Sequence, residues 1–256
     1  MLRPIRRAYQ FVMDHPIKDG QCIHQRYLIK ELLGAGSYGI VYLCEDLQTQ
    51  DCKVVKQLRP SKRKMKKELQ LFEKEKSLIQ KLDHPHMPKF YEDFTENGNL
   101  FFVMSFIEGD NLDEAIFSKQ ISFHEQEALQ FVSKLLSLVE YLHQRNIYHL
   151  DLRIPNIIIQ KNEPYVIDFG LAKEVIDHEV AKEMKLQDFY DFGDILLYLL
   201  YTTYPAKKKK ALPWTEELSL QQETVYLLKR LLQITSPYTT IEDIGIDFDK
   251  AMKANE

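Results

Sequence analysis

The chain has 256 residues, a formal net charge of −4 and a hydrophobic content of 45%. This length and apolar content suffice for one large domain or two closely packed lobes, and they exclude a disordered or fibrous chain. The small net charge gives no overall preference for nucleic acid or for anionic membranes. The cysteines Cys22, Cys44 and Cys52 lack metal-ligand spacing, and no signal peptide or membrane span is evident. We therefore expect a cytoplasmic protein with free thiols.

The first half of the chain predicts an antiparallel sheet with one helix. Three β-rich segments come first, at residues 26–34 (RYLIKELLG), 40–45 (IVYLCE) and 53–58 (KVVKQL). A helical pattern runs from about Ser61 to Leu82, and two further strands, KFYEDF and LFFVMSF, flank the turn ENGN. We expect five strands and one helix over residues 21–104. An N-terminal arm, residues 1–20, precedes them, and its packing is left open.

The second half of the chain predicts a mostly helical lobe. Beyond a short connection at residues 105–109, strands become scarce and apolar residues recur at helical spacing. The clearest stripe consists of Ala128, Leu129, Phe131, Val132, Leu135, Leu136, Val139 and Leu142. A later buried helix, DFYDFGDILLYLL, is expected to open at Asp188. The fold class is therefore α+β, a single domain with two lobes and a helical lobe over residues 110–256.

A glycine cluster lies between the first two predicted strands. Gly34, Gly36 and Gly39 form the pattern G-x-G-x-x-G. A dinucleotide-binding fold would place this pattern between a strand and a helix, so its position between two strands favours a flap over phosphates. Glycines allow backbone N–H groups to approach phosphate oxygens closely. A simple glycine-rich hairpin is the alternative.

A lysine and a glutamate form the next candidate pair. Lys56 ends the strand KVVK, and Glu75 lies in the apolar stripe of the predicted helix. A carboxylate on a buried helix face needs a partner, and Lys56 is the natural candidate. Such a pair would hold the ammonium group on the phosphates of a nucleotide.

The strongest pattern is YHLDLRIPNIII followed by YVIDFGLAK. Asp151 and Asn156 lie five residues apart in a loop after the long helix, and Asp168 follows a short β segment. Two carboxylates and a carboxamide offer hard oxygen ligands for Mg²⁺, together with a group that can orient or deprotonate a hydroxyl. Either motif alone could be a pair of polar turns. The order and spacing together favour a phosphoryl-transfer site.

Over residues 24–245 the chain resembles the eukaryotic-like serine/threonine protein kinases of bacteria, in a compact soluble form. The resemblance implies ATP as the nucleotide, Mg²⁺ or alternatively Mn²⁺ as the metal, and a Ser/Thr hydroxyl of a protein as the acceptor. It implies that the nucleotide is bound by Gly34, Gly36, Ser37, Gly39, Val41, Val54, Lys56, Met104, Ser105, Ile107 and Ile158.

The resemblance also assigns roles to the remaining motif residues. Asp151 would orient the hydroxyl, Arg153 would lie near the γ-phosphate, and Lys56 would pair with Glu75. Asn156 and Asp168 would hold the metal, and Asp188 would fix the catalytic loop backbone. Four further residues, Ile79, Phe90, His149 and Phe169, match the apolar stack that aligns the lobes of active kinases.

The sequence departs from the family between the metal-binding Asp168 and Asp188. This segment is short, lacks an A-P-E motif, and has no Ser, Thr or Tyr within residues 169–187. Leu150 stands where an Arg usually receives a phosphorylated activation loop, and Val54 replaces a smaller residue above the adenine. We therefore expect no activation by phosphorylation of this segment. The losses also remove the usual platform for a peptide beside the phosphoacceptor.

Other functions stay open at this point. One alternative is a kinase-fold small-molecule phosphotransferase or a RIO/Bud32-like ATPase, and another is an ATP-binding pseudokinase scaffold. The intact glycine pattern and the string IDFGLAK favour a protein kinase. Two basic clusters, Lys62–Lys67 and Lys207–Lys210, are more simply solvated surface than sites for nucleic acid or an acidic partner. The sequence does not define an oligomeric state.

Overall fold

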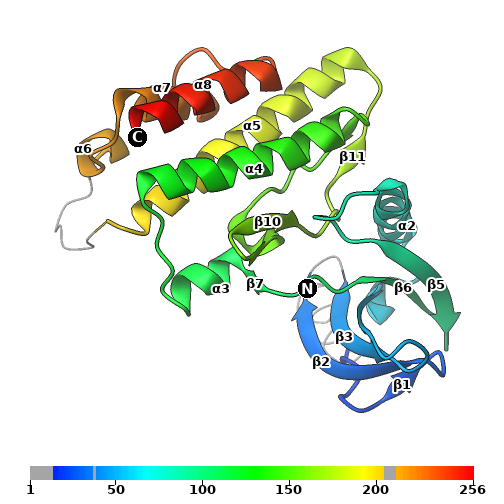
Figure 1. Ribbon diagram of the computed structural model, residues 1–256. Coiled ribbons are helices and arrows are strands. Elements are labelled where there is room, and N and C mark those ends of the chain that lie inside the picture. Colours follow the sequence, from blue (N-terminus) through cyan, green and yellow to red (C-terminus); the bar gives the residue numbers. More distant parts are fainter. Residues whose placement is uncertain (1–13, 37–38, 205–211) are drawn as a thin grey trace, which may run out of the picture. The chain divides into compact units, whose positions relative to one another are not determined.

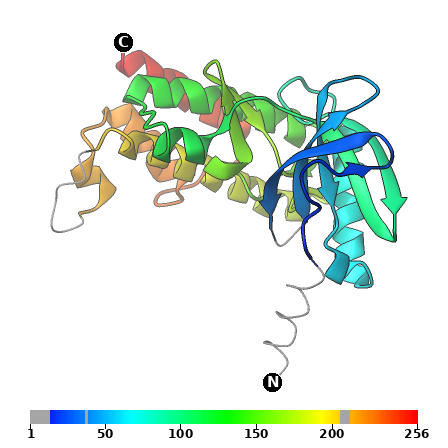
Figure 2. The same ribbon diagram turned by 90° about the horizontal axis from the view of Figure 1, so that it is seen from below.

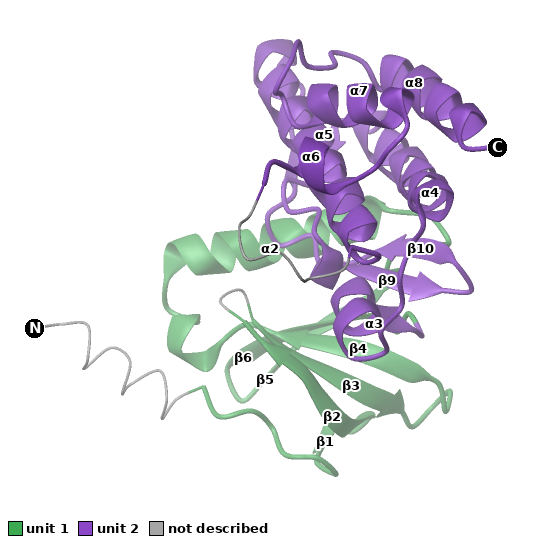
Figure 3. Ribbon diagram, turned by 90° about the vertical axis from the view of Figure 1, so that its left-hand side faces the viewer, with its two compact units in different colours: residues 1–107 green, residues 108–256 purple. Residues whose placement is uncertain are grey.

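A computed structural model describes residues 14–36, 39–204 and 212–256 of the chain (Figure 1). The chain divides into two compact units, residues 1–107 and residues 108–256 (Figure 3). Three predicted features lie outside the described residues: Ser37, the Lys207–Lys210 cluster, and the N-terminal arm up to residue 13.

The first unit contains an antiparallel sheet and helix α2 (Figure 1). Its strands are β1 (Cys22–Ile23), β2 (Tyr27–Ala35), β3 (Ile40–Asp46), β4 (Cys52–Gln57), β5 (Phe90–Glu96) and β6 (Asn99–Ser105). The strand order is β1-β2-β3-β4-β6-β5. Five of these strands match the prediction. The sixth strand, β1, pairs with the edge of β2. Because β1 has only two residues, it is too short to show alternation in the sequence.

The core of this unit lies on one face of the sheet. Ile40, Tyr42 and Cys44 alternate along β3 with side chains that are less buried, which is the two-residue period of a strand. The buried cluster comprises Ile23, Tyr27, Ile29, Ile40, Tyr42, Cys44, Val55, Phe94, Phe101 and Val103. Burial raises the pKa of the Cys44 thiol to about 12, so this cysteine acts as a core residue.

The described end of the N-terminal arm packs on this first unit. Ile17 lies against the core cluster, and its backbone N–H donates to the Tyr42 hydroxyl at 3.1 Å. The Gly20 N–H donates to the Ile29 carbonyl at 2.8 Å. Residues 14–20 therefore pack on the first unit. The sequence alone had left the packing of this part of the arm open.

Helix α2 spans Lys66–Lys81 and starts later than the sequence indicates. Pro60 opens a separate 3₁₀ turn, η1 (Pro60–Lys62), so the helical ladder begins only after Met65. The buried face of α2 carries Phe72, Glu75, Leu78 and Ile79. Three of these side chains are apolar, and the fourth is the predicted glutamate.

The second unit is mostly helical. Its helices are α3 (Leu112–Phe117), α4 (Glu125–His143), α5 (His178–Tyr201), α6 (Trp214–Glu217), α7 (Gln222–Leu231) and α8 (Ile241–Ala254), with the 3₁₀ turn η2 (Ile154–Asn156). Its strands are β7 (Asp110–Asn111), β8 (Ile147–Tyr148), β9 (Ile157–Gln160), β10 (Glu163–Val166) and β11 (Lys173–Glu174), in sheets ordered β10-β9-β7 and β11-β8. Helix α4 packs against both α5 and α8 (Figures 1 and 2).

Helix α5 begins much earlier than the sequence suggests. It starts at His178, and Asp177 caps it by accepting hydrogen bonds from the N–H groups of Glu179 and Val180. The expected opening at Asp188 is wrong, because the first turns are mostly exposed and polar and give no apolar period. Asp188 instead lies inside a helix that is already formed.

A search of the helices in the described ranges finds none that is both long and apolar enough to cross a membrane.

Candidate active site

The glycine cluster forms the tip of the β2–β3 hairpin in the first unit. Gly34 faces Val41 across the hairpin, and Val41 faces Lys56 on β4. A Cβ atom on Gly39 would lie 2.8 Å from the Gln57 carbonyl oxygen and 3.4 Å from Cε of Lys56, so only glycine fits at this position. At Gly34 and Gly36 a Cβ would meet no described atom within 4 Å. These two glycines leave space that a ligand's phosphates could occupy.

Lys56 and Glu75 form a buried ion pair within the first unit. Nζ of Lys56 donates to Oε1 of Glu75, and both residues are only 3% exposed. β4 delivers the lysine and the apolar face of α2 delivers the glutamate, so packing of the helix on the sheet brings the two charges together. A buried pair of this kind fixes the position of the ammonium group.

The other predicted nucleotide residues of this unit lie on neighbouring strands. Val54 on β4 faces Leu43 on β3 and Met104 on β6, and both Val54 and Met104 are buried. Ser105 is tied to Lys89, because the N–H of Lys89 donates to Oγ of Ser105 at 3.0 Å. Ile107 follows β6 and is partly buried.

An arginine that the motifs did not identify holds the glycine hairpin. Arg59 donates from Nε to the Gly36 carbonyl at 2.7 Å and from Nη2 to the Ala35 carbonyl at 3.1 Å. Its third nitrogen, Nη1, donates to Asp14 at 3.1 Å, and Asp14 also accepts from the N–H and the hydroxyl of Ser61. Arg59 lies in an irregular connection, where no periodic pattern could reveal its contacts.

The loop before β9 in the second unit brings Asp151 and Asn156 together. Nδ2 of Asn156 donates to the Asp151 backbone carbonyl at 2.9 Å and to its Oδ2 at 3.0 Å. The turn η2 makes this possible, because it folds the five-residue spacing back on itself. Arg153 is mostly exposed, with Nη1 4.0 Å from Oδ1 of Asp151.

The β9–β10 hairpin places Asp168 next to this loop. Ile157 faces Val166 across the hairpin, and the N–H of Ile167 donates to the Asn156 carbonyl at 3.0 Å. Asp168 adopts a φ of 60°, and its Oδ1 accepts from the Gly170 N–H at 3.2 Å. A non-glycine residue in this left-handed region is uncommon and is typical of sites under functional constraint. The hairpin also buries Ile158, which faces Tyr165.

The oxygen atoms of Asn156 and Asp168 suit Mg²⁺ or Mn²⁺. Both are hard ligands, and Mg²⁺ usually binds through one or two protein groups together with substrate phosphates. The described residues contain no cluster of three or more His, Cys, Asp or Glu side chains that could enclose a metal.

Asp188 of α5 binds the backbone N–H groups of the two residues before Asp151. This carboxylate is fully buried and accepts from the N–H of His149 at 3.1 Å and of Leu150 at 2.8 Å. It also contacts the His143 ring nitrogen at 2.7 Å. Leu150 has a φ of 62°, and the hydrogen bond to Asp188 helps to hold this uncommon conformation.

The predicted apolar stack has its second-unit members in contact. The rings of His149 and Phe169 lie 5.1 Å apart. Burial lowers the pKa of His149, so the imidazole is neutral and packs as an apolar group. In the first unit, Ile79 is buried and Phe90 is partly buried.

The segment after Asp168 is even shorter than the sequence indicates. β11 pairs with β8, with Lys173 opposite Tyr148, and the Asp177 cap of α5 follows directly. Little irregular chain is left between Phe169 and the helix. The second unit therefore offers no long activation loop.

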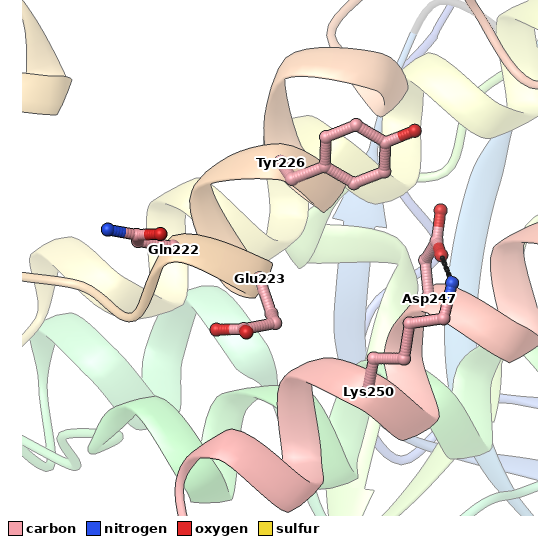
Figure 4. A pocket seen from close by; sticks show the side chains of 5 residues that line it. All are labelled: Gln222, Glu223, Tyr226, Asp247 and Lys250. Carbon is pink, nitrogen blue, oxygen red and sulfur yellow. Dashed lines mark hydrogen bonds and ion pairs between the residues drawn. The ribbon is translucent and has the colours of Figure 1, made fainter.

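A surface hollow of about 360 Å³ lies elsewhere in the second unit, on α7 and α8 (Figure 4). It is lined by Gln222, Glu223, Tyr226, Asp247 and Lys250. Asp247 is already bound by Arg230 at 3.0 Å, Tyr238 at 2.8 Å and Lys250 at 2.8 Å. The contact of Arg230 with Asp247 joins α7 to α8, so we assign the hollow a structural origin.

The antiparallel sheet with a buried Lys–Glu pair, and the loop with Asp151, Asn156 and Asp168, define a phosphotransferase of the kinase class. The sequence profile of the protein kinase domain matches residues 27–206, and the chain belongs to this family.

Similar proteins include one that matches nearly end to end. The probable serine/threonine-protein kinase YbdM of Bacillus subtilis is 44% identical over 247 residues, which cover 96% of both chains. The human serine/threonine-protein kinase Nek11 is 33% identical over 59% of this chain and 24% of its own length. Serine/threonine-protein kinase D of Synechocystis is 31% identical over 59% of this chain and 31% of its own length.

Proposed function

We propose that this ATP-dependent serine/threonine-protein kinase transfers the γ-phosphoryl group of ATP to protein hydroxyls with Asp151 as the catalytic carboxylate. The observation that carries the proposal is the loop geometry. The side chain of Asn156 donates a hydrogen bond to Asp151, and the carbonyl of Asn156 accepts one from the N–H of Ile167, the residue before Asp168. The name of the near full-length Bacillus relative supports a Ser/Thr acceptor.

The residues of the first unit bind the nucleotide. The backbone of Gly34 and Gly36 can approach the phosphates, since no described side chain fills the space beside these glycines. Lys56, held by Glu75, directs its ammonium group at the α- and β-phosphates. Val54 and Met104 supply apolar surface for the base.

The residues of the second unit act on the acceptor. Asp151 accepts a hydrogen bond from the attacking hydroxyl and takes its proton as the oxygen forms a bond to the γ-phosphorus and ADP departs. Arg153, close to Asp151 and exposed, can contact the γ-phosphate. Asn156 and Asp168 would hold Mg²⁺, or Mn²⁺ in its place, which neutralises charge on the phosphates.

The experiment is an incubation of the purified chain with ATP labelled in the γ position, Mg²⁺, and generic protein acceptors. Phosphoamino acid analysis should find label on serine or threonine, and Asp151→Asn should abolish it. Label confined to small molecules would favour the phosphotransferase alternative, release of phosphate alone would favour an ATPase, and nucleotide binding without turnover would favour a scaffold.

The compartment is a separate proposal. Cys22, Cys44 and Cys52 are all free thiols, as is usual for proteins of a reducing compartment, so we place the kinase in the cytoplasm.

A further inference from the structure

Helix α5 carries a second buried carboxylate that the kinase motifs do not explain. Asp191 lies three residues after Asp188, on the same side of the helix, and it is buried. Its Oδ2 accepts from the N–H of Leu152 at 3.1 Å, and its Oδ1 accepts from Nε2 of Gln187 at 2.8 Å. Both carboxylate oxygens are therefore engaged, one with the catalytic loop and one with α5 itself.

The two carboxylates bind the residues on either side of the catalytic aspartate. Asp188 holds the N–H of Leu150, and Asp191 holds the N–H of Leu152. The residue between them is Asp151, whose side chain accepts from Asn156 at 3.0 Å and lies 4.0 Å from Arg153. The backbone of Asp151 is thus fixed by two neighbouring positions of a single helix.

We propose that Asp191 is a positioning residue for phosphoryl transfer, which with Asp188 clamps the backbone on both sides of Asp151. The inference rests on the proposed catalytic role of Asp151. Because main-chain placement sets where the Asp151 carboxylate lies, a small shift of the loop would cost rate without weakening nucleotide binding.

A carboxylate at this position has an energetic cost. Burial, together with the negative charges of Asp188 on α5 and Asp151 on the loop, raises the pKa of Asp191 to about 7, although the hydrogen bonds from Gln187 and Leu152 act in the opposite direction. An asparagine would supply an acceptor for the Leu152 N–H without burying a charge. Charge-assisted hydrogen bonds are about twice as strong as neutral ones, so the ionised form holds the loop more firmly.

The raised pKa fixes the sign of the effect of pH on stability. The folded state binds the Asp191 proton more tightly than the unfolded state, where the pKa is near 3.8. The resulting stabilisation is fully present below about pH 3.8 and is lost as the pH rises through about 7. At pH 8, Asp191→Asn should therefore be more stable than the wild type.

The test measures kcat, the KM for ATP and the melting temperature of Asp191→Asn and Asp191→Ala between pH 6 and 8.5. At pH 8 we expect kcat to fall about fivefold for Asn and more than about tenfold for Ala, with KM for ATP within about twofold. The Asn variant should melt about 3 °C or more above the wild type at that pH. Asp194→Asn, an exposed position on the same helix, is the matched control.

The ratio of wild-type kcat to Asp191→Asn kcat separates positioning from a structural role. Groups that titrate in both proteins affect the two kcat values alike and cancel in the ratio. The ratio should therefore rise from about one at pH 6 to about five at pH 8.5. A flat ratio near one, or a folded Asp191→Ala variant with wild-type kcat, would overturn the proposal. If Asp191→Ala does not fold, the Asn ratio decides. Full activity of Asp151→Asn would instead refute the proposed function.

Discussion

The two units of this kinase hold their functional groups in different ways. In the first unit the group itself is fixed, because Nζ of Lys56 is bound by the buried Glu75. In the second unit the main chain is fixed, because Asp188 and Asp191 bind the amides of Leu150 and Leu152.

The difference shows where each unit is sensitive to substitution. A change at Lys56 or Glu75 alters a buried charge, so it should affect both activity and stability. The loop proposed as catalytic has the side chain of Asp151 partly exposed, while buried carboxylates of α5 bind its backbone. There, a change in the reactive side chain should affect activity alone.

The largest effects should come from Asp168→Asn and Lys56→Met. Each should reduce phosphoryl transfer by far more than tenfold, because one removes a proposed metal ligand and the other removes the cation proposed to bind the phosphates. Urea unfolding should leave Asp168→Asn near the wild type and place Lys56→Met about 3 kcal/mol lower, since Glu75 then lacks that cation. Lys30→Met, an exposed lysine on β2, is the control. Residual activity above about a tenth in either variant would contradict its assigned role.

The next effect separates charge from packing at Glu75. Glu75→Gln should lose activity but keep more stability than Glu75→Ala, because the amide retains the volume and a hydrogen-bonding group on the buried face of α2. We expect costs of about 1.5 kcal/mol for Gln and about 3 kcal/mol for Ala in urea unfolding. Equal losses of unfolding free energy in the two variants would contradict the view that volume and hydrogen bonding at position 75 stabilise the buried face of α2.

A smaller effect is expected at the glycine hairpin. Arg59→Gln removes the guanidinium that binds the Ala35 and Gly36 carbonyls, so the flap should be less ordered. The KM for ATP should rise about threefold with kcat nearly unchanged, because ground-state binding is weakened uniformly. Arg63→Gln, a basic residue of the same connection, is the matched control. A fall in kcat at constant KM would place the role of Arg59 in the transition state instead.

The smallest expected effect is that of phosphatase treatment, which should leave basal activity within about twofold. Switching by phosphorylation places about two negative charges opposite an Arg cluster. Residues 169–187 offer no hydroxyl, and Leu150 replaces the receiving Arg. Phosphopeptide mapping should find any autophosphorylation outside this segment. A treated sample that lost most activity and regained it with ATP would refute this view.

The sequence predicts most strongly those features that depend on short, regular spacing. The alternation in β3, the stripe of α4 and the hairpin that joins Asn156 to Asp168 all have a fixed period or a fixed separation. The Lys56–Glu75 contact was also predictable, because a carboxylate on an apolar helix face requires a cation.

The remaining features depend on contacts between distant segments. The polar first turns of α5 show no apolar period, so its start was hidden until the Asp177 cap was seen. Arg59 is a loop arginine whose partners, Asp14 and the glycine hairpin, are far away along the chain. Asp191 lies within a buried helix motif, but only the fold brings it to the amide of Leu152.

The carboxylate clamp also sets the timescale on which the catalytic loop can move. Loops usually open on their own at low free energy, whereas amides buried in a core exchange with solvent only when a larger part of the protein unfolds. The amides of Leu150 and Leu152 are bound by buried carboxylates of α5, so the loop cannot open without disturbing that helix. This segment is a loop in its backbone shape, but we expect its amides to exchange with solvent as slowly as those of the buried helices of the second unit.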